Sequence, residues 1–288
     1  MTHDVTVLGS LNLDVVVHLP RVPGVGETVL ASGQQRVPGG KGLNQAVAAA
    51  RAGARTVMLG AVGDDDAARV LRETAGSAGV DVSGVRREPG PSGTAWVMVQ
   101  DGGDNAIVVD AAANGTVTSL TGCDLDAVRS AAVLVMQLET PLPAVTQAAS
   151  AASRAGVRVV LNAAPARDLP EELLALVDVL VVNEHEARAF PDALAAGVGT
   201  VVVTLGADGA RVVCADGEQA VPGVTADVVD TTGAGDTFTG YLAAALATGA
   251  SLPDACGRAV VAGALAVEVL GATASIPTAD AVERRLQR

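Results

Sequence analysis

Residues 131–164, AAVLVMQLETPLPAVTQAASAASRAGVRVVLNAA, carry the pattern that predicts the fold. The apolar run AAVLVMQLE (131–139) predicts a strand, LPAVTQAASAASRAG (142–156) a helix, and VRVVLNAA (157–164) a second strand. Both strand runs are almost continuously apolar, which indicates a sheet that is covered on both faces. Two strands joined through a helix are typical of parallel pairing.

The same alternation continues in both directions from this unit. Further strands are predicted at VTVLGS (5–10), RTVMLGAVG (55–63), VDVLVVN (177–183) and VGTVVVTLG (198–206). Further helices are predicted at KGLNQAVAAARAGA (41–54), DDAARVLRETAGSAG (65–79), about 236–249 and about 253–269. We therefore expect an α/β fold of three layers, with a mostly parallel central sheet covered by helices.

Two segments lack helices and interrupt the alternation. Residues 11–36 contain short strand-like pieces separated by proline and glycine turns, and residues 93–110 predict a hairpin with glycine and aspartate at its tip. These segments are expected to form a small additional sheet over one edge of the main sheet. The sequence shows no linker and no internal repeat, which favours one domain over residues 1–288.

The composition narrows the class of protein. Hydrophobic residues make up 49% of the 288 residues, and the formal net charge of −13 makes nucleic acid an improbable partner. Three widely spaced cysteines without a C-x-x-C motif indicate a reducing compartment, and the three histidines do not cluster as zinc ligands would. The N-terminus lacks the zones of a signal peptide, and no apolar run is long enough to span a membrane. A cytoplasmic location is expected.

The turn DTTGAGD (230–236) precedes a predicted helix. Its glycines would let the free N–H groups of the helix N-terminus converge on an anion, and Asp236 beside them could take a proton from a hydroxyl that attacks phosphorus. The alternative is that Asp236 only caps the helix. The turn is not a dinucleotide fingerprint, since Phe238 occupies the place of the third glycine, and GGKG (39–42) is not a Walker A loop, since Gly42 follows the lysine.

Polar residues recur where the apolar strands end. Asn12 and Asp14 are two apart and would share one side of a strand. The remaining members of this set are Lys41 and Asn44 in PGGKGLNQ (38–45), Glu139, Asn183, Glu186, Thr204, Gly206 and Gly209. Singly, each could be a turn, capping or solvated residue. Together they fit one crevice at the carboxyl edge of the sheet.

The chain resembles the ribokinase family of sugar and nucleoside kinases, the phosphofructokinase-B group. The resemblance rests on GGKGLNQAVAAARAGA (39–54) followed by GAVGDD (60–65), and on DTTGAGDTFTGYL (230–242). It extends nearly end to end, through GSLNLD (9–14), MQLETPL (136–142) and VTLGADGA (203–210).

The resemblance implies transfer of the γ-phosphate of ATP to the 5-hydroxyl of D-ribose, which gives ribose 5-phosphate. It implies that Asp236 is the catalytic base and that the amides of Gly233, Ala234 and Gly235 form the anion hole. The implied sugar-binding residues are Asn12, Asp14, Gly40, Lys41, Asn44, Ala95, Ile107, Glu139 and Asp236. The implied nucleotide-binding residues are Asn183, Glu186, Thr204, Leu205, Gly206, Ala207, Asp208, Gly209 and Gly235.

The resemblance also implies two cations and a second subunit. Mg²⁺ would lie near Glu186 of the N-x-x-E motif, through water, and K⁺ would stabilise the anion-hole turn. The implied K⁺ ligands are oxygens of Asp230, Thr232, Ala266, Val269, Gly271 and Ser275. The small sheet of residues 11–36 and 93–110 would be a lid over the sugar and would pair two subunits into a homodimer.

Two departures from the family pattern concern the nucleotide side. Only PDALAAGVGT (191–200) separates Phe190 from Val201, where family members usually carry another helix, and Val260 stands where a polar residue is usual near the adenine. Three functions stay open: a kinase of ribose, a related kinase of another sugar such as deoxyribose or of a nucleoside, and a non-catalytic sensor. Trp96 is the only aromatic residue in the expected lid, which favours a small sugar, and the intact Asp236 and glycine turn favour an enzyme.

Overall fold

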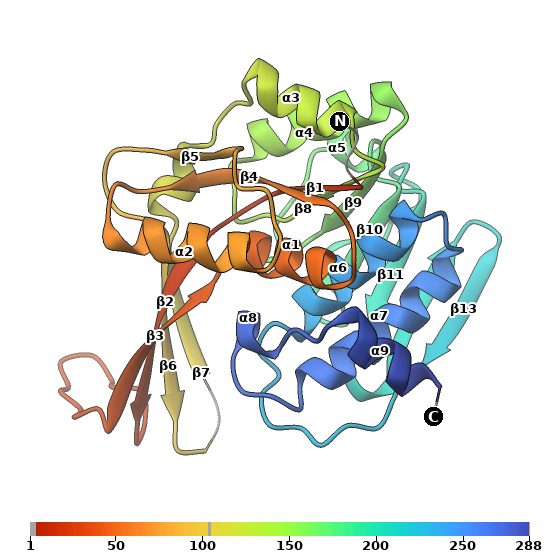
Figure 1. Ribbon diagram of the computed structural model, residues 1–288. Coiled ribbons are helices and arrows are strands. Elements are labelled where there is room, and N and C mark those ends of the chain that lie inside the picture. Colours follow the sequence, from red (N-terminus) through yellow and green to blue (C-terminus); the bar gives the residue numbers. More distant parts are fainter. Residues whose placement is uncertain (1–3, 103–104, 288) are drawn as a thin grey trace.

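A nine-stranded sheet runs through the computed structural model, which describes residues 4–102 and 105–287 (Figure 1). The strand order is β13-β12-β11-β10-β9-β8-β1-β4-β5. All neighbours are parallel except the two antiparallel pairs β11–β12 and β12–β13. The strands are β1 (Val5–Leu8), β4 (Thr56–Val62), β5 (Val85–Arg87), β8 (Val133–Met136), β9 (Arg158–Asn162), β10 (Val179–Asn183), β11 (Thr200–Thr204), β12 (Gly209–Cys214) and β13 (Gly217–Pro222).

Helices cover both faces of this sheet and bury two separate apolar cores. One core is covered by α1 (Lys41–Arg51), α2 (Asp66–Ser77), α6 (Ala234–Ala247), α7 (Leu252–Ala266) and α9 (Ala279–Leu286). The other is covered by α3 (Gly122–Arg129), α4 (Leu142–Ala155) and α5 (Glu171–Leu174). Val133 and Val135 of β8 face the first core, whereas Leu134 and Met136 face the second. Both faces of the strand are buried, which explains its continuous apolar sequence. This arrangement confirms the predicted three-layer α/β fold.

The structure adds elements that the sequence pattern did not predict. Helix α6 begins at Ala234, two residues before the expected start, and α7 ends at Ala266 rather than 269. Strands β12 and β13 and helix α9 were not predicted. Most residues of β13 are exposed, so that strand carries no apolar run, and α9 buries only Val282.

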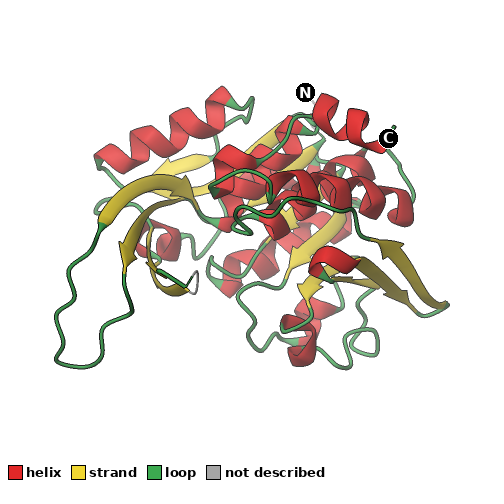
Figure 2. Cartoon of the chain, turned by 90° about the horizontal axis from the view of Figure 1, so that it is seen from below, coloured by secondary structure: helices red, strands yellow, loops and turns green. Residues whose placement is uncertain are grey.

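The two interrupting segments form a separate four-stranded sheet, hereafter the small sheet, as predicted (Figure 2). Its order is β3-β2-β6-β7, and it extends away from the helices at the lower left of Figure 1. Strands β2 and β6 pair in parallel, while β2–β3 and β6–β7 are antiparallel. The strands are β2 (Asn12–Leu19), β3 (Gly33–Gly39), β6 (Thr94–Gln100) and β7 (Asn105–Asp110). The tip of the predicted hairpin, residues 103–104, lies outside the described residues.

Within the described residues, no helix is both long and apolar enough to cross a lipid bilayer. The segment between Phe190 and Thr200, which the structure describes throughout, contains turns and no helix, in agreement with its short sequence.

Candidate active site

Asp236 lies in the first turn of α6, and its carboxylate points away from the helix amides. Gly233 is the residue that precedes the helix, with φ of 76°, a left-handed conformation that glycine adopts without strain. The Asp236 carboxylate instead accepts hydrogen bonds from Asn44 Nδ2 at 3.0 Å and from Gln45 Nε2 at 2.8 Å. The alternative that Asp236 is an ordinary helix cap is therefore wrong.

The start of α6 is open on the side where an anion would lie. A Cβ added to Gly235 would meet no heavy atom of the described residues within 4 Å, whereas most of the Asp236 side chain is buried. The Ala234 amide donates to the Thr231 carbonyl at 3.3 Å. The positive end of the helix dipole lies at this turn, next to a buried carboxylate. This arrangement can hold a negatively charged group beside a proton acceptor.

The glycines of PGGKGLNQ allow the start of α1 to lie against β1 and β2. Gly40 has φ of 90°, and a Cβ on Gly42 would lie 2.5 Å from the amide nitrogen of Ser10. A Cβ on Gly39 would lie 2.2 Å from Asp14 Oδ2. These contacts place the end of β3 against Asp14 and the start of α1 against Ser10.

Asp14 is a half-buried carboxyl close to other carboxylates. Burial raises the pKa of Asp14 to about 7, a hydrogen bond from the Ala95 amide opposes that rise, and the charges of Glu139 and Asp236 add to it. The Ala95 amide donates to Asp14 Oδ1 at 3.2 Å. The repulsion between these charges indicates that Asp14, Glu139 and Asp236 lie near one another, as the predicted crevice would require.

Lys41 supplies the positive charge of this crevice. Its burial disfavours the charged amine, but the nearby carboxylates outweigh that effect and raise the pKa of Lys41 above its ordinary value. Those carboxylates are Asp236, Glu139 and Glu186. Lys41 is therefore a half-buried charge with acidic neighbours rather than a fully solvated surface group.

Glu139 belongs to the crevice and does not cap the next helix. Its Oε2 accepts from Ser10 Oγ at 2.5 Å and from the Lys41 amide at 3.2 Å. Helix α4 is preceded by Pro141 and has no side-chain cap among the described residues. The capping alternative for Glu139 is therefore wrong.

Asn12 is fixed by a residue that the sequence analysis missed. Its Oδ1 accepts from Asn114 Nδ2 at 2.8 Å, and Asn114 also accepts from the Leu11 amide at 2.9 Å. A Cβ on Gly93 would lie within 2.3 Å of both side chains, so only glycine fits beside them. The bonds of Asn114 leave the side-chain amide nitrogen of Asn12 as the group that can donate to a ligand.

The small sheet presents different residues on its two faces. The strand register pairs Val15 with Trp96 and Val97 with Ile107, so Asp14, Ala95 and Ile107 share one face and Trp96 lies on the other. Ala95 is buried, whereas 55% of Ile107 is exposed. The predicted lid residues therefore lie on the Asp14 face.

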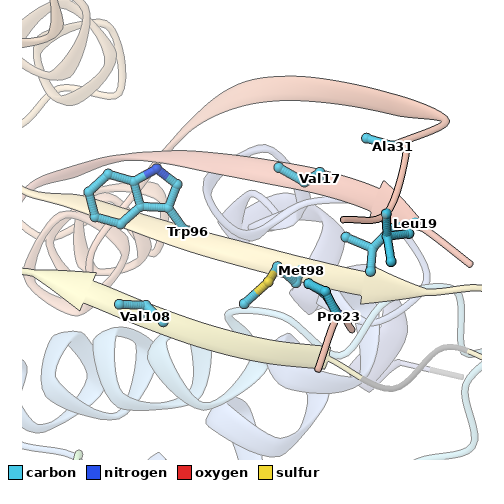
Figure 3. Close-up of a pocket in the computed structure, with 8 residues that line it drawn as sticks. Val17, Leu19, Pro23, Ala31, Trp96, Met98 and Val108 are labelled. Carbon is cyan, nitrogen blue, oxygen red and sulfur yellow. The ribbon is translucent and has the colours of Figure 1, made fainter. Parts of the chain in front are cut away.

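The opposite face of the small sheet carries an apolar hollow of about 410 Å³ (Figure 3). Trp96 and Val108 are 41% and 56% exposed. The residues that line the hollow are Val17, Leu19, Pro23, Val29, Ala31, Trp96, Met98 and Val108. We call this set the outer apolar face.

The predicted nucleotide residues gather at the ends of β10 and β11. Asn183 and Thr204 are register neighbours. Asn183 Oδ1 accepts from the Glu186 amide at 2.8 Å, and Glu186 Oε2 accepts from the Asn183 amide at 2.9 Å. The Gly206–Asp208 turn with Leu205 and Ala207 follows and ends at Gly209, where φ is 94°. The N-x-x-E motif is thus a reciprocally bonded turn that aims one carboxylate at this edge of the sheet.

Asp230 ties the anion turn to the segment that follows α7. Its two carboxylate oxygens accept from the amides of Thr232 at 2.9 Å and Gly271 at 2.8 Å. Partial burial opposes ionisation, but these hydrogen bonds outweigh it and lower the pKa of Asp230. Asp230, Thr232 and Gly271, three of the predicted K⁺ ligands, are held together by these two bonds. The other predicted members are Ala266, Val269 and Ser275.

The described residues contain no group of three or more His, Cys, Asp and Glu side chains arranged to hold a metal ion. A divalent ion at Glu186 would therefore depend mainly on water and on phosphate oxygens, as Mg²⁺ commonly does.

Three further residues of the site were missed by the sequence analysis: Gln45, Gln137 and Asn162. All are buried, and Gln45 is bonded to Asp236, to Asn162 and to Gln137. Gln137 is two residues before Glu139 at the end of β8, so a second polar residue on the same side of an apolar run was the available signal. Val260, the departure near the expected adenine site, is buried within α7.

Comparisons with known proteins identify the family of this chain. The model of the pfkB family carbohydrate kinases matches residues 2–279. A ribokinase of Bacillus subtilis is 37% identical over 98% of this chain and 99% of its own, and one of Haemophilus influenzae is 36% identical over 96% of both. The structure of Arabidopsis thaliana ribokinase complexed with ribose and ATP matches with a TM-score of 0.94, 33% identity and full coverage of both chains.

Proposed function

Because the chain belongs to the pfkB family of carbohydrate kinases, we propose that it transfers the γ-phosphate of ATP to the 5-hydroxyl of D-ribose. The observation that carries this proposal is the buried Asp236 carboxylate beside the open N-terminus of α6. A proton acceptor and an anion site are the two elements that phosphoryl transfer to an alcohol requires from the protein.

In the proposed reaction, the hydroxyl oxygen forms a bond to the γ-phosphorus while the bond to the ADP oxygen breaks. The hydroxyl proton passes to Asp236, and the amides of Gly233, Ala234 and Gly235 stabilise the charge on the transferring group. A base of this kind contributes roughly 10²–10⁴ in rate. Lys41 partly neutralises the acidic crevice, which eases the approach of the phosphates.

We assign sugar recognition to the residues that surround this space. Asn12 offers a donor, the Asp14 and Glu139 carboxyls offer acceptors, and Lys41 and Asn44 complete the set. Gly40 brings α1 close enough, and Ala95 and Ile107 cover the sugar from the small sheet. The ends of β10 and β11 with the 204–209 turn would hold ATP.

Two cations complete the proposal. Mg²⁺ on the ATP phosphates, reached by Glu186 through water, would neutralise charge during transfer. K⁺ at the Asp230 segment would fix the shape of the anion turn without touching substrate. Replacing K⁺ with Na⁺ should therefore lower kcat and leave KM for the sugar little changed, and equal rates in both salts would contradict the K⁺ site.

The small sheet is proposed to act as a lid within one 288-residue domain and to pair two subunits. A lid excludes water, which would otherwise compete with the sugar for the phosphate. The outer apolar face is the surface proposed for the second copy. A cytoplasmic location stays a prediction that rests on the cysteines, all three of which are free in the structure.

The test is a panel of D-ribose, 2-deoxyribose, other pentoses, hexoses and nucleosides with Mg·ATP, followed through ADP release. We expect D-ribose to give the highest kcat/KM. A higher kcat/KM with deoxyribose or a nucleoside would instead assign the chain as a related kinase of that acceptor. If none of these acceptors raises ADP release above background, a non-catalytic sensor would be favoured. A nucleoside is disfavoured because Trp96 faces away from Asp14 and cannot stack on a base there.

A further inference from the structure

A buried chain of carboxamides leads from Asp236 into the interior. Gln45 Nε2 donates to Asp236 Oδ1 at 2.8 Å and to Asn162 Oδ1 at 3.1 Å. Gln137 Nε2 donates to Gln45 Oε1 at 2.7 Å. The side chains come from α1, β9, the end of β8 and α6. Gln45 and Gln137 are fully buried, so they touch no sugar or nucleotide.

The direction of every amide in this chain is determined. Asp236 in its proposed role as base only accepts, so Gln45 must turn its NH₂ group toward it. Asn162 Nδ2 donates to the Val181 carbonyl at 3.2 Å, which leaves Asn162 Oδ1 as a second acceptor on the same side. The Gln45 oxygen must then face Gln137, whose NH₂ group meets it.

Because the Gln45 oxygen needs a donor, Gln137 turns its NH₂ group toward Gln45, and its own oxygen is left without a hydrogen bond from the described residues. Its Oε1 is buried and accepts no hydrogen bond from the described residues. That oxygen lies against Gly9, where an added Cβ would stand 2.0 Å away. A buried oxygen without a donor is unfavourable, so the orientation of Gln137 is imposed by Gln45 rather than by its own surroundings.

We infer that Gln45 and Gln137 are positioning residues that hold the Asp236 carboxylate in the geometry for proton abstraction. Asn44, at the proposed sugar site, donates to the other oxygen of Asp236. Gln45 is fully buried, so a bound ligand does not reach its hydrogen bond to Asp236. Gln45 can therefore hold Asp236 unchanged before and after the sugar binds. The inference rests on the proposed role of Asp236 as base.

The test compares Gln45→Met, Gln137→Met and the double variant by steady-state kinetics with D-ribose and Mg·ATP. Methionine keeps the length of glutamine and removes both hydrogen-bonding groups. We expect Gln45→Met to lower kcat by on the order of 10- to 10²-fold with both KM values near wild type, because a misplaced base slows the chemical step alone. Gln137→Met should lower kcat less, and the double variant should be no slower than Gln45→Met.

The matched control is Gln147→Met on α4, where the lost bond is to the Leu120 amide at 2.8 Å, far along the chain from the site. Its kcat should equal that of wild type. A folded Gln45→Met with wild-type kcat, or multiplicative losses in the double variant, would overturn the inference. If Gln45→Met does not fold, Gln137→Met becomes the test. A wild-type kcat for Gln137→Met would then overturn the inference.

Asp236→Asn separates this failure from failure of the proposed function. If Asp236→Asn is inactive while Gln45→Met is normal, only the positioning role is wrong. If Asp236→Asn keeps wild-type turnover, the base assignment fails and the positioning role fails with it.

Discussion

At the scale of the residue, the site depends on one carboxylate that is buried yet ionisable. Asp236 keeps two amide donors, from Asn44 and Gln45, in place of the water it lost. The sequence indicated Asp236 and Asn44 through their positions beside glycine turns. It did not indicate Gln45, because adjacent helix residues point in different directions, and only the packing of α1 between β-strands and α6 lets both reach one carboxylate.

Asp236→Asn removes the proton acceptor and keeps the shape of the side chain. We expect kcat to fall by at least about 10²–10⁴, the contribution of a general base, while the variant folds and binds ribose and ATP. Rapid-mix kinetics with calorimetry of each ligand measures this. Turnover close to wild type would refute the role of Asp236.

Asp14 links sugar binding to a pH-dependent cost in stability. The pKa of Asp14 rises from an ordinary 3.8 to about 7 on folding. Its contribution to the free energy of unfolding is therefore fully present below pH 3.8 and is lost as pH rises through about 7. Asp14→Asn removes that loss. The Tm of the variant relative to wild type should therefore increase between pH 5 and pH 8, by a few °C for about 1–2 kcal/mol.

The same variant should bind D-ribose more weakly and ATP almost normally, because a carboxamide offers one acceptor oxygen where the carboxylate offers two. Calorimetry at pH 8 measures both ligands. A Tm difference that is flat with pH, or an equal loss of ATP binding, would count against the assigned surroundings of Asp14.

At the scale of the element, the contact between α1 and α6 sets the distance from the base to its partners. Gly240 on α6 makes this contact possible, since a Cβ there would lie 2.4 Å from Ala48 Cβ and 2.5 Å from the Gln45 carbonyl. The glycines were visible in the sequence. Which helix each one faces was not, because that depends on how two distant segments cross.

Gly240→Ala should push α1 and α6 apart. We expect a loss of stability of about 1–3 kcal/mol from overpacking, and a fall in kcat as Asp236 shifts from Asn44 and Gln45. Gly257→Ala on α7 is the control, since its Cβ would meet no atom of the described residues within 4 Å, and it should gain about 0.5–1 kcal/mol. Urea unfolding and kcat measure both variants, and equal behaviour of the two would contradict the packing argument.

In the whole molecule, the small sheet has two different faces, to which the two proposed tasks are assigned. The Asp14 face is proposed to cover the sugar, and the outer apolar face, with Trp96 and Val108, is proposed to pair two subunits. An exposed aromatic next to several aliphatic side chains is typical of a surface that another protein covers.

Val108→Glu places a charge in the outer apolar face and should turn the proposed dimer into monomers. Sedimentation velocity at micromolar protein measures this. Leu286→Glu is the control, because Leu286 is also exposed, at 43%, but lies on α9 outside the small sheet. A wild-type protein that sediments as a monomer, or a Val108→Glu variant that stays dimeric, would contradict pairing through this face.

Local sequence patterns were enough to predict the layered α/β sheet, the small sheet and the candidate residues at the glycine turns and strand ends. These follow from local patterns: apolar runs report burial on both faces, and glycines report close approach of the backbone. The folded chain was needed to see that Asp236 accepts hydrogen bonds from Asn44 and Gln45, and that Gln137, just after β8, donates to Gln45. Those contacts join residues up to 192 positions apart, and their directions are fixed by packing and by donor–acceptor matching, which no local pattern encodes.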